Sequence, residues 1–314
     1  MMRNTIHVGD NLSFLRTLPD ACVDLCVTSP PYYQLRDYQH THQVGRESSV
    51  AEYIQTLVEL FTEVARVLTP AGSCWVNLGD TYHQKRLLQV PSRFELAMGD
   101  AGWCLRNEII WQKPNPQPMS AKHRFWVNHE KFFWFVKHPD RYYFDQQAIL
   151  VPQAEISIRR MFSQNHLEKR KDAGATEQEG FAISSVQQER HYARRRASLG
   201  IEKDFDYDAL VASGRCPMRP TFTVWPIAST TYAGAHFAVY PPELIRMPIR
   251  ACAPVGGLVL DPFLGSGTTA LVAQQEHRDY VGCELNPEYA ALASARLVQT
   301  PAGDSTLFDE PKTV

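Results

Sequence analysis

Residues 258–270, Leu-Val-Leu-Asp-Pro-Phe-Leu-Gly-Ser-Gly-Thr-Thr-Ala, decide the fold class of this 314-residue chain. The apolar run Leu258 to Asp261 predicts a buried strand, the two glycines predict a tight loop, and a helix is expected from Thr268. Such a loop lets a ligand approach the backbone amides at the start of a helix. This succession of strand, loop and helix is typical of α/β folds.

The loop also has the spacing of a dinucleotide-binding fingerprint, Gly265-x-Gly267-x-x-Ala270. Glu284 ends the next predicted strand, Tyr280 to Glu284, where a carboxylate accepts both hydroxyls of a ribose. We therefore expect a ligand that contains a nucleoside, although the same glycines also suit a merely tight turn. A phosphate-binding P-loop is disfavoured, because no lysine follows the second glycine.

The glycine loop lies unusually late in the chain, after residue 260 of 314. Too few residues follow it to complete a doubly wound sheet, so the other strands must come from upstream. The sheet is therefore expected to be permuted in sequence. The remaining predicted strands are 5–8, 23–28, 73–78, 108–111 and 131–137, and the remaining helices are 11–18, 49–68, 242–252 and 287–298.

A second motif, Thr28-Ser29-Pro30-Pro31-Tyr32, follows directly on the predicted strand 23–28. Two consecutive prolines make the turn stiff, and the carbonyls around Pro30 are free to accept hydrogen bonds. Hydroxyl and carbonyl acceptors beside an aromatic ring suit a planar group that bears an NH2. A plain Pro-Pro turn with a core tyrosine is the other interpretation.

Composition excludes several classes of protein. Hydrophobic residues make up 44% and charged residues 21% of the chain, as in globular proteins. Membrane spans and a signal peptide are not indicated, so we expect a cytoplasmic protein. Seven scattered cysteines without a CxxC pair suggest neither disulfides nor a zinc site. The net charge is −2, but residues 156–196 hold nine Lys or Arg against five Asp or Glu.

The two motifs together resemble the catalytic and cofactor motifs of the amino-group DNA methyltransferases, which use S-adenosylmethionine and release S-adenosylhomocysteine. Their order resembles the permuted beta class, in which a target-recognition region lies between them. The resemblance covers about positions 5–150 and 234–298. It implies a Rossmann-like S-adenosylmethionine-dependent methyltransferase sheet in an α/β fold, circularly permuted, with an inserted target-recognition region.

The resemblance also implies site residues. The catalytic residues would be Ser29, Pro30, Pro31 and Tyr32. Asp10 would contact the adenine of the cofactor and His236 would help to enclose its methionine end; a simple strand-end turn and a surface histidine are the alternatives. No metal is implied. The full cofactor-binding set is Asp10, His236, Asp261, Pro262, Phe263, Gly265, Ser266, Gly267, Thr268, Thr269 and Glu284.

In this family the methyl group passes directly to an exocyclic amine, without a covalent enzyme intermediate. The Ser29 hydroxyl and the Pro30 carbonyl are the expected acceptors for the amine, and the Tyr32 ring is expected to stack on a base flipped out of the duplex. Serine at the first motif position resembles enzymes that act on N4 of cytosine. Transfer to N6 of adenine remains the alternative, because both amines present the same hydrogen-bond pattern.

We expect four parts: a catalytic half at 1–150, a target-recognition insert at 151–215, a cofactor-binding half at 216–300, and a flexible tail at 301–314. Double-stranded DNA is the expected partner. The sequence leaves open whether a cognate restriction endonuclease exists. It also leaves open whether the protein is a monomer or a homodimer. The basic residues of the insert could instead form only a charged, solvated face. In that case residues 113–129 would be the next candidate for the segment that recognises the target. The expected DNA contacts are Arg159, Arg160, Lys169, Arg170, Lys171, Arg194, Arg195 and Arg196.

Four other functions fit the sequence less well. An NAD-dependent oxidoreductase would explain the glycine loop and Glu284 but leaves Ser29 to Tyr32 without a role. A cytosine-C5 methyltransferase is disfavoured, because its cysteine nucleophile usually follows a proline and the neighbours Cys216-Pro217 have the reverse order. A non-catalytic DNA-binding module that keeps only the methyltransferase fold is disfavoured, because both motifs are intact. An RNA target is disfavoured, because the permuted motif order resembles that of DNA enzymes.

Overall fold

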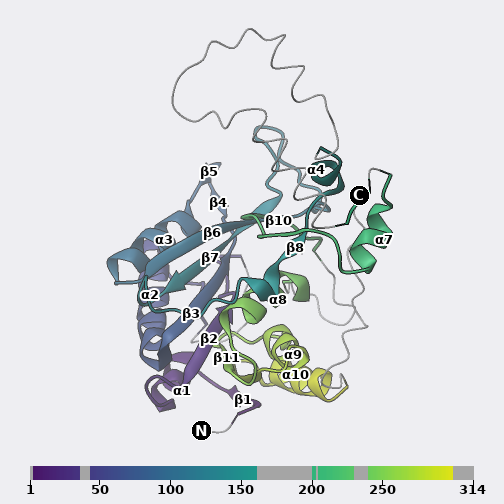
Figure 1. Cartoon of the computed structure of the whole chain (residues 1–314). Helices are drawn as coiled ribbons and strands as arrows, with labels where there is room; N and C mark the ends of the chain where they lie inside the picture. The colour runs from purple at the N-terminus through teal and green to yellow at the C-terminus, as the bar shows by residue number, and fades with distance from the viewer. Residues whose placement is uncertain (1–2, 36–42, 161–199, 203, 230–239, 300–314) are drawn as a thin grey trace, which may run out of the picture. The chain divides into compact units, whose positions relative to one another are not determined.

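The computed structural model describes residues 3–35, 43–160, 200–202, 204–229 and 240–299. They belong to two units (Figure 1). The first comprises residues 1–149 and 222–314, and the second comprises residues 150–221.

The first unit is built on an eight-stranded sheet in the order β1-β12-β11-β2-β3-β7-β6-β10. Strand β7 is antiparallel to both of its neighbours, and the other neighbouring strands are parallel. The strands are β1 (Thr5–Val8), β2 (Val23–Thr28), β3 (Leu68–Leu78), β6 (Cys104–Gln112), β7 (His129–Val136), β10 (Val224–Pro226), β11 (Leu258–Asp261) and β12 (Asp279–Glu284).

Helices cover both faces of this sheet (Figure 1). On one face lie α1 (Asn11–Thr17), α2 (Val50–Val67) and α3 (Val90–Asp100). On the other lie α8 (Pro242–Cys252) and α9 (Thr268–Gln275), and α10 (Pro287–Gln299) packs against α9 and β1. A 3-10 turn, η1 (Gln147–Ile149), contacts α8, and a small hairpin joins β4 (Tyr82–His83) to β5 (Arg86–Leu87).

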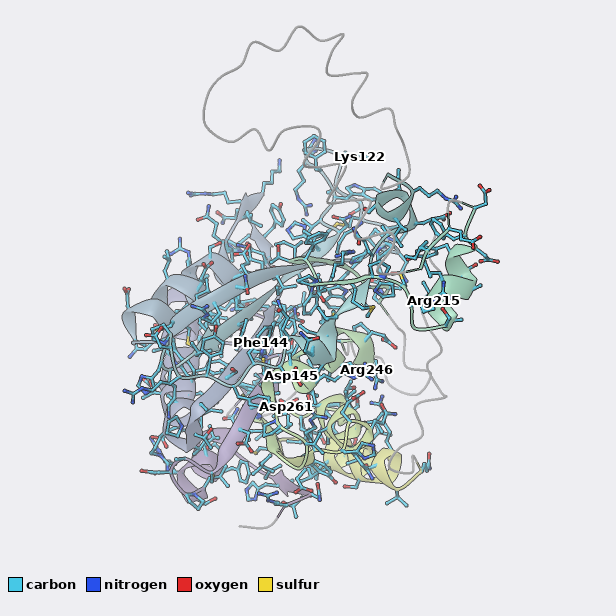
Figure 2. The ribbon with its side chains drawn as sticks, viewed as in Figure 1. Lys122, Phe144, Asp145, Arg215, Arg246 and Asp261 are labelled. Atoms are coloured by element: carbon cyan, nitrogen blue, oxygen red, sulfur yellow. The ribbon has the colours of Figure 1, made fainter. Side chains whose placement is uncertain are left out.

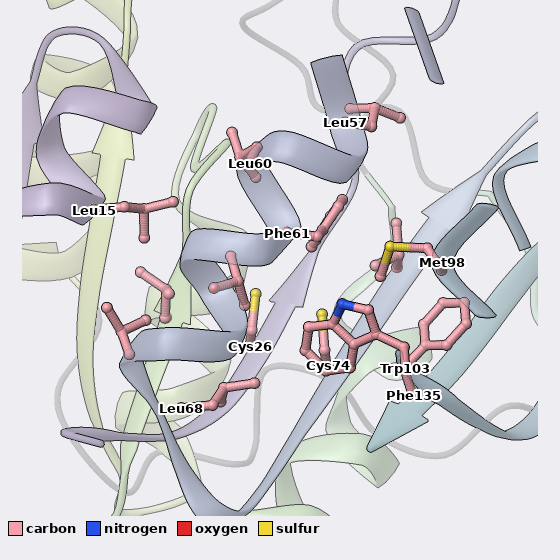
Figure 3. Close-up of a cluster of buried hydrophobic side chains, with 14 of the residues drawn as sticks. Leu15, Cys26, Leu57, Leu60, Phe61, Leu68, Cys74, Met98, Trp103 and Phe135 are labelled. Carbon is pink, nitrogen blue, oxygen red and sulfur yellow. The ribbon is translucent and has the colours of Figure 1, made fainter. Parts of the chain in front are cut away.

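Alternate residues of the central strands supply two separate cores, as the period of a strand requires. On β7, Phe133 and Phe135 point to the α1–α3 side, whereas Phe132 and Trp134 point to the α8–α9 side. Figure 3 shows the first core, where Leu57, Leu60 and Phe61 of α2 lie over the strands that carry Cys26 and Cys74. Because helices bury both faces of the sheet, both sets of alternate residues are apolar, and the sequences of these strands are continuous apolar runs.

The expected α/β fold with a mostly parallel, permuted sheet is confirmed. Strand β1, from the start of the chain, pairs with β12, from its end, and β12 lies between β1 and β11. Strand β11 and helix α8 have the predicted limits. Strands β3 and β6 are longer than predicted, and β10 was not anticipated as an edge strand beside β6.

Helix α3 was not predicted either. Its N-cap, Gln89, has a left-handed backbone and makes no side-chain capping bond, so the capping signal is absent and Pro91 in the first turn is the sequence signal that remains.

The described part of the second unit is small. It contains β8 (Val151–Pro152) paired with β9 (Met218–Arg219), and the short helices α4 (Glu155–Arg160) and α7 (Tyr207–Ala212). A compact apolar cluster holds it together, formed by Ile158, Ile201, Leu210 and Cys216. Among the described residues of both units, no helix is long and apolar enough to cross a membrane.

The two glycines of the 258–270 loop have different structural roles. Both have positive φ, +54° at Gly265 and +82° at Gly267. A Cβ at Gly267 would lie 2.8 Å from the Cβ of Ala293 in α10, whereas a Cβ at Gly265 would meet no atom of the described residues within 4 Å. Gly267 is therefore required for the close approach of α10 to the start of α9, and Gly265 borders open space.

We predict that Gly267→Ala destabilises the protein by about 2–4 kcal/mol, because it adds a clash to a strained backbone. Gly265→Ala is the matched control and should lose only the strain, about 1 kcal/mol. Urea unfolding of the two variants measures the difference. Equal losses would contradict the packing role of Gly267.

Candidate active site

The sequence motifs meet at the carboxyl ends of four adjacent strands, β1, β12, β11 and β2. Val8 pairs with Glu284, and the Gly9 amide donates to the Glu284 carbonyl at 3.0 Å, so Asp10 begins α1 beside the end of β12. Leu260 pairs with Cys26, so β11 and β2 end next to each other. In open α/β sheets, ligands bind at this edge, where the strand order changes direction.

Glu284 joins the glycine loop to the next strand end. Its Oε2 accepts a hydrogen bond from the Gly265 amide at 2.8 Å, and its Oε1 accepts one from the Asn286 amide at 2.9 Å. Burial raises the pKa of this carboxyl. Each carboxylate oxygen has two acceptor positions, so capacity for two ribose hydroxyls remains. Asp10 lies near it and caps α1, with its Oδ2 accepting from the Ser13 amide at 2.7 Å.

The loop itself fits a nucleoside ligand. The Ser266 hydroxyl is buried and has no hydrogen-bond partner among the described residues. A buried, unpaired polar group is costly unless a ligand or water satisfies it. It lies beside Gly265, where a side chain would enter open space. The loop therefore has open space at Gly265, and the neighbouring residue carries a buried hydroxyl without a partner among the described residues.

Asp261 joins the glycine loop to the Ser-Pro-Pro-Tyr turn. It is 2% exposed, and its carboxylate accepts four hydrogen bonds. Oδ1 accepts from the Thr28 hydroxyl at 2.6 Å and from the Phe263 amide at 3.0 Å. Oδ2 accepts from the Tyr240 hydroxyl at 3.1 Å and from Thr269. We call this group the Asp261 clamp. Burial raises the pKa of Asp261, and its hydrogen bonds act in the opposite direction.

The other predicted cofactor residues have varied positions. Thr269 belongs to the Asp261 clamp, and the Thr268 hydroxyl accepts from Arg296 of α10 at 3.0 Å, so both threonine side chains point into the protein. Pro262 is buried, and Phe263 is half-buried against the α1–α3 core. His236 lies outside the described residues. The tight bonding of Asp261, Thr268 and Thr269 favours positioning of the loop over direct side-chain contact with a ligand.

The turn that carries Ser29 is supported from behind. The Tyr53 hydroxyl of α2 donates to the Pro31 carbonyl at 2.8 Å. Gly45, with φ of +99°, lies so close that a Cβ there would be 3.1 Å from the Tyr32 carbonyl oxygen. The Pro31 carbonyl is thus engaged by Tyr53, and the Ser29 side chain forms a hydrogen bond with Tyr32.

Tyr32 is held by residues to which the sequence assigned no role. Its hydroxyl lies 2.5 Å from Oε2 of Glu130 and 3.0 Å from Oδ1 of Asn77. Burial and the charge of Glu130 keep the pKa of Tyr32 well above its usual value, so the hydroxyl stays a donor. A Cβ at Gly79 would come within 2.6 Å of the ring. Glycine is therefore needed beside the ring.

Glu130 in turn forms an ion pair with Lys113, whose Nζ lies 4.4 Å from the centre of the Trp111 ring. These residues stand at the ends of β6 and β7. The only signal in the sequence is a charged residue two positions from each of two apolar runs, which does not by itself reveal the pairing.

The predicted DNA-contact residues lie in the second unit, and most are outside the described range. Arg159 pairs with Glu155, and its guanidinium carbon lies 4.8 Å from the centre of the Phe205 ring. Arg160 ends α4. The residues outside the described range are Lys169, Arg170, Lys171, Arg194, Arg195 and Arg196.

Comparison with known families agrees with this arrangement of motifs. A model of N6 and N4 methyltransferases, described as DNA methylase, matches residues 23–295. The chain belongs to this DNA methylase family. The family match does not support the NAD-dependent oxidoreductase interpretation.

Relatives of this methylase are similar along almost its whole length. The Type II methyltransferase M.Cfr9I of Citrobacter freundii is 35% identical, over 93% of this chain and 87% of its own. The Type II methyltransferase M.SmaI of Serratia marcescens is 33% identical, over 94% of this chain and 90% of its own.

Solved structures share the fold. The PvuII DNA methyltransferase (cytosine-N4-specific) superposes with a TM-score of 0.63 at 21% identity, covering 94% of this methylase and 86% of that chain. A protein of Thermus thermophilus, solved in complex with S-adenosyl-L-methionine, superposes with a TM-score of 0.56 at 22% identity, covering 96% of each.

We predict that Asp261→Ala destabilises the methylase by about 3–5 kcal/mol, because it leaves four buried donors without their acceptor. Asp261→Asn keeps one oxygen and should lose less. Asp279→Ala, which removes a half-exposed pair with Arg3 and an exposed bond from Asn4, is the control and should lose about 0–1 kcal/mol. Chemical unfolding compares the three. If Asp261→Ala loses no more stability than the control, the clamp contributes nothing to the free energy of unfolding.

Proposed function

We propose that this methylase transfers a methyl group from S-adenosylmethionine to the N4 amine of a cytosine flipped out of duplex DNA, at a specific sequence. The observation that carries the proposal is the Asp261 clamp, which fixes the Ser29 turn against the loop of Gly265 and Glu284. One motif suits an amine and the other suits a nucleoside, and the clamp places them at neighbouring strand ends.

The cofactor supplies an electrophilic methyl group. The amine is a poor nucleophile because its lone pair is delocalised into the base ring. The Ser29 hydroxyl and the Pro30 carbonyl accept its two N–H groups and draw the nitrogen toward tetrahedral geometry. These bonds strengthen as positive charge develops on the nitrogen. The stiff turn and the clamp keep the acceptors in line with the methyl donor, which lowers the entropic part of the barrier.

Tyr32 receives the flipped base in this proposal. Unstacking a base from the duplex costs a few kcal/mol, and stacking on an aromatic ring returns roughly 1–3 kcal/mol. Glu130 and Asn77 hold the hydroxyl, and Gly79 lies against the ring, so the stacking surface is formed before DNA arrives. Glu130 is therefore a positioning residue in this scheme.

Cytosine is favoured over adenine by Ser29 at the first motif position and by the similarity in fold to an enzyme described as cytosine-N4-specific. Transfer to N6 of adenine is the second candidate, since the acceptors fit either amine.

We further propose that the segment 151–215 recognises the target sequence and that its basic residues contact phosphates. Relatives named Type II methyltransferases support a place in a restriction-modification system, with a cognate endonuclease that recognises the same DNA. In the four-part organisation that we propose, the catalytic half is 1–150, the cofactor half is 216–300 and the tail is 301–314.

Sequencing of DNA from cells that express the protein, combined with mass spectrometry of its nucleosides, tests the function. We expect N4-methylcytosine at one sequence motif. Ser29→Ala should lower the methylation rate about 100- to 1,000-fold, as loss of a transition-state hydrogen bond does elsewhere. Its thermal stabilisation by S-adenosylhomocysteine should match the parent's. N6-methyladenine would replace the first candidate by the second, and no modified base would overturn both.

For Tyr32, we predict that Tyr32→Ala loses most activity, because the stacking face is removed. Tyr32→Phe should lose less, about 5- to 20-fold, because it keeps the ring but loses a bond to a carboxylate. Glu130→Gln should resemble Tyr32→Phe, and the double variant should be little worse than either single one. Single-turnover kinetics give the four rates. Equal rates for Tyr32→Ala and Tyr32→Phe would contradict the stacking role.

A further inference from the structure

We propose that residues 81–89 and 114–129 form a surface that lies on duplex DNA, and that Phe125 inserts at the target base pair. We call these residues the loop surface. The inference rests on the proposed function, and it adds a contact region in the first unit, separate from the segment 151–215. It also assigns Phe125 a part in base flipping.

The first observation is charge. The loop surface contains Lys85, Arg86, Lys122 and Arg124 and not one Asp or Glu, in a chain with net charge −2. A cluster of cations without interspersed acids is the electrostatic complement of a phosphate backbone. Lys85, Arg86 and Lys122 are exposed, and Figure 2 shows the side chain of Lys122 on the outside of its loop.

The second observation is that the two segments contact each other. The guanidinium carbon of Arg124 lies 3.7 Å from the centre of the Tyr82 ring, next to the β4–β5 hairpin. Its Nη1 is buried without a hydrogen-bond partner within the described part of the chain. Stacking on Tyr82 thus fixes the position of the Arg124 charge. Among the described residues, no acid forms an ion pair with it.

The third observation is the exposure of Phe125. Its side chain is 97% exposed, although both neighbours in sequence are held. Arg124 stacks on Tyr82, and the Trp126 indole donates to the Ala121 carbonyl at 2.9 Å. A single exposed apolar residue is ordinary on a protein surface. Here the ring projects from an anchored, cationic loop, and such apolar side chains are what DNA-bending proteins insert between bases.

The fourth observation is location. The Lys113 amide donates to the Asn128 carbonyl at 2.7 Å and so closes the base of the loop. Lys113 also pairs with Glu130, which holds the Tyr32 hydroxyl. The loop that presents Phe125 therefore begins at the residues that position the proposed base-stacking ring. Insertion of Phe125 would fill the space left by the flipped base, and this favours the open state of the pair.

Substitution of Phe125 tests the inference. The substrate is a synthetic duplex carrying the sequence found methylated in expressing cells, with the target base either paired or opposite an abasic site. Phe125→Ala should lower kcat/KM on the paired duplex by about tenfold or more, because a stacking contact is lost. Most of this loss should disappear on the abasic duplex, where opening the target costs little. Leu96→Ala, an exposed apolar residue of α3, should match the parent on both.

Salt dependence tests the rest of the surface. Each phosphate contact contributes about 0.9 to the slope of log affinity against log salt, so Lys85→Ala with Lys122→Ala should reduce the slope by about 1.8. Arg16→Ala with Arg141→Ala is the control, because α1 ends at Thr17 and β7 ends at Val136, both remote from the carboxyl ends of the parallel strands. Its slope should equal the parent's.

Parental activity of Phe125→Ala on the paired duplex, or the same loss on both duplexes, would overturn the insertion role. An unchanged salt slope for the lysine pair would overturn the surface. Either result leaves the proposed function intact, whereas a parent protein that methylates no DNA would refute that function itself.

Discussion

The structure depends on one buried carboxylate. Asp261 accepts hydrogen bonds from three hydroxyls and one amide, which come from β2, the glycine loop, α9 and Tyr240, two residues before α8. A desolvated carboxylate is tolerated in a protein only when such donors surround it, and here the donors come from both motif regions. In the proposed function, this carboxylate would set the geometry of methyl donor and acceptor without touching either of them. Folding and the proposed activity would then depend on the same residue.

Much of this arrangement was predictable from the residues. The late glycine loop required strands from upstream, and the sheet order has that form, with β1 beside β12. Strand β11 was delimited correctly because an apolar run, an aspartate and a glycine turn leave little choice of limits. Local patterns of this kind act within a few residues and can be recognised without knowledge of the rest of the chain.

The contacts that hold Tyr32 were not predictable in the same way. Glu130 lies 98 residues from Tyr32 in sequence, and nothing near either residue indicates that they meet. Position 79 likewise requires glycine because the Tyr32 ring, which follows the end of another strand, lies against it. Helix α3 escaped prediction for a different reason, since its start lacks a capping side chain and is held by tertiary packing of Val90, Phe94 and Met98. To predict which residues meet across a sheet, the order of its strands must be known. A single sequence indicates that order only approximately.

The pairing of β1 with β12 has a consequence for how the protein is made. Arg3 and Asn4 bond to Asp279, a separation of 276 and 275 residues, so β1 has no neighbour in the sheet until β12, the last of the described strands, has been synthesised. Contacts of such long range slow folding and leave an unpaired strand edge exposed in the meantime. A nascent chain that stops before residue 279 has Gly9 and Asp10 but lacks Glu284 beside them. The nucleoside site proposed there would therefore be complete only after β12 has been made.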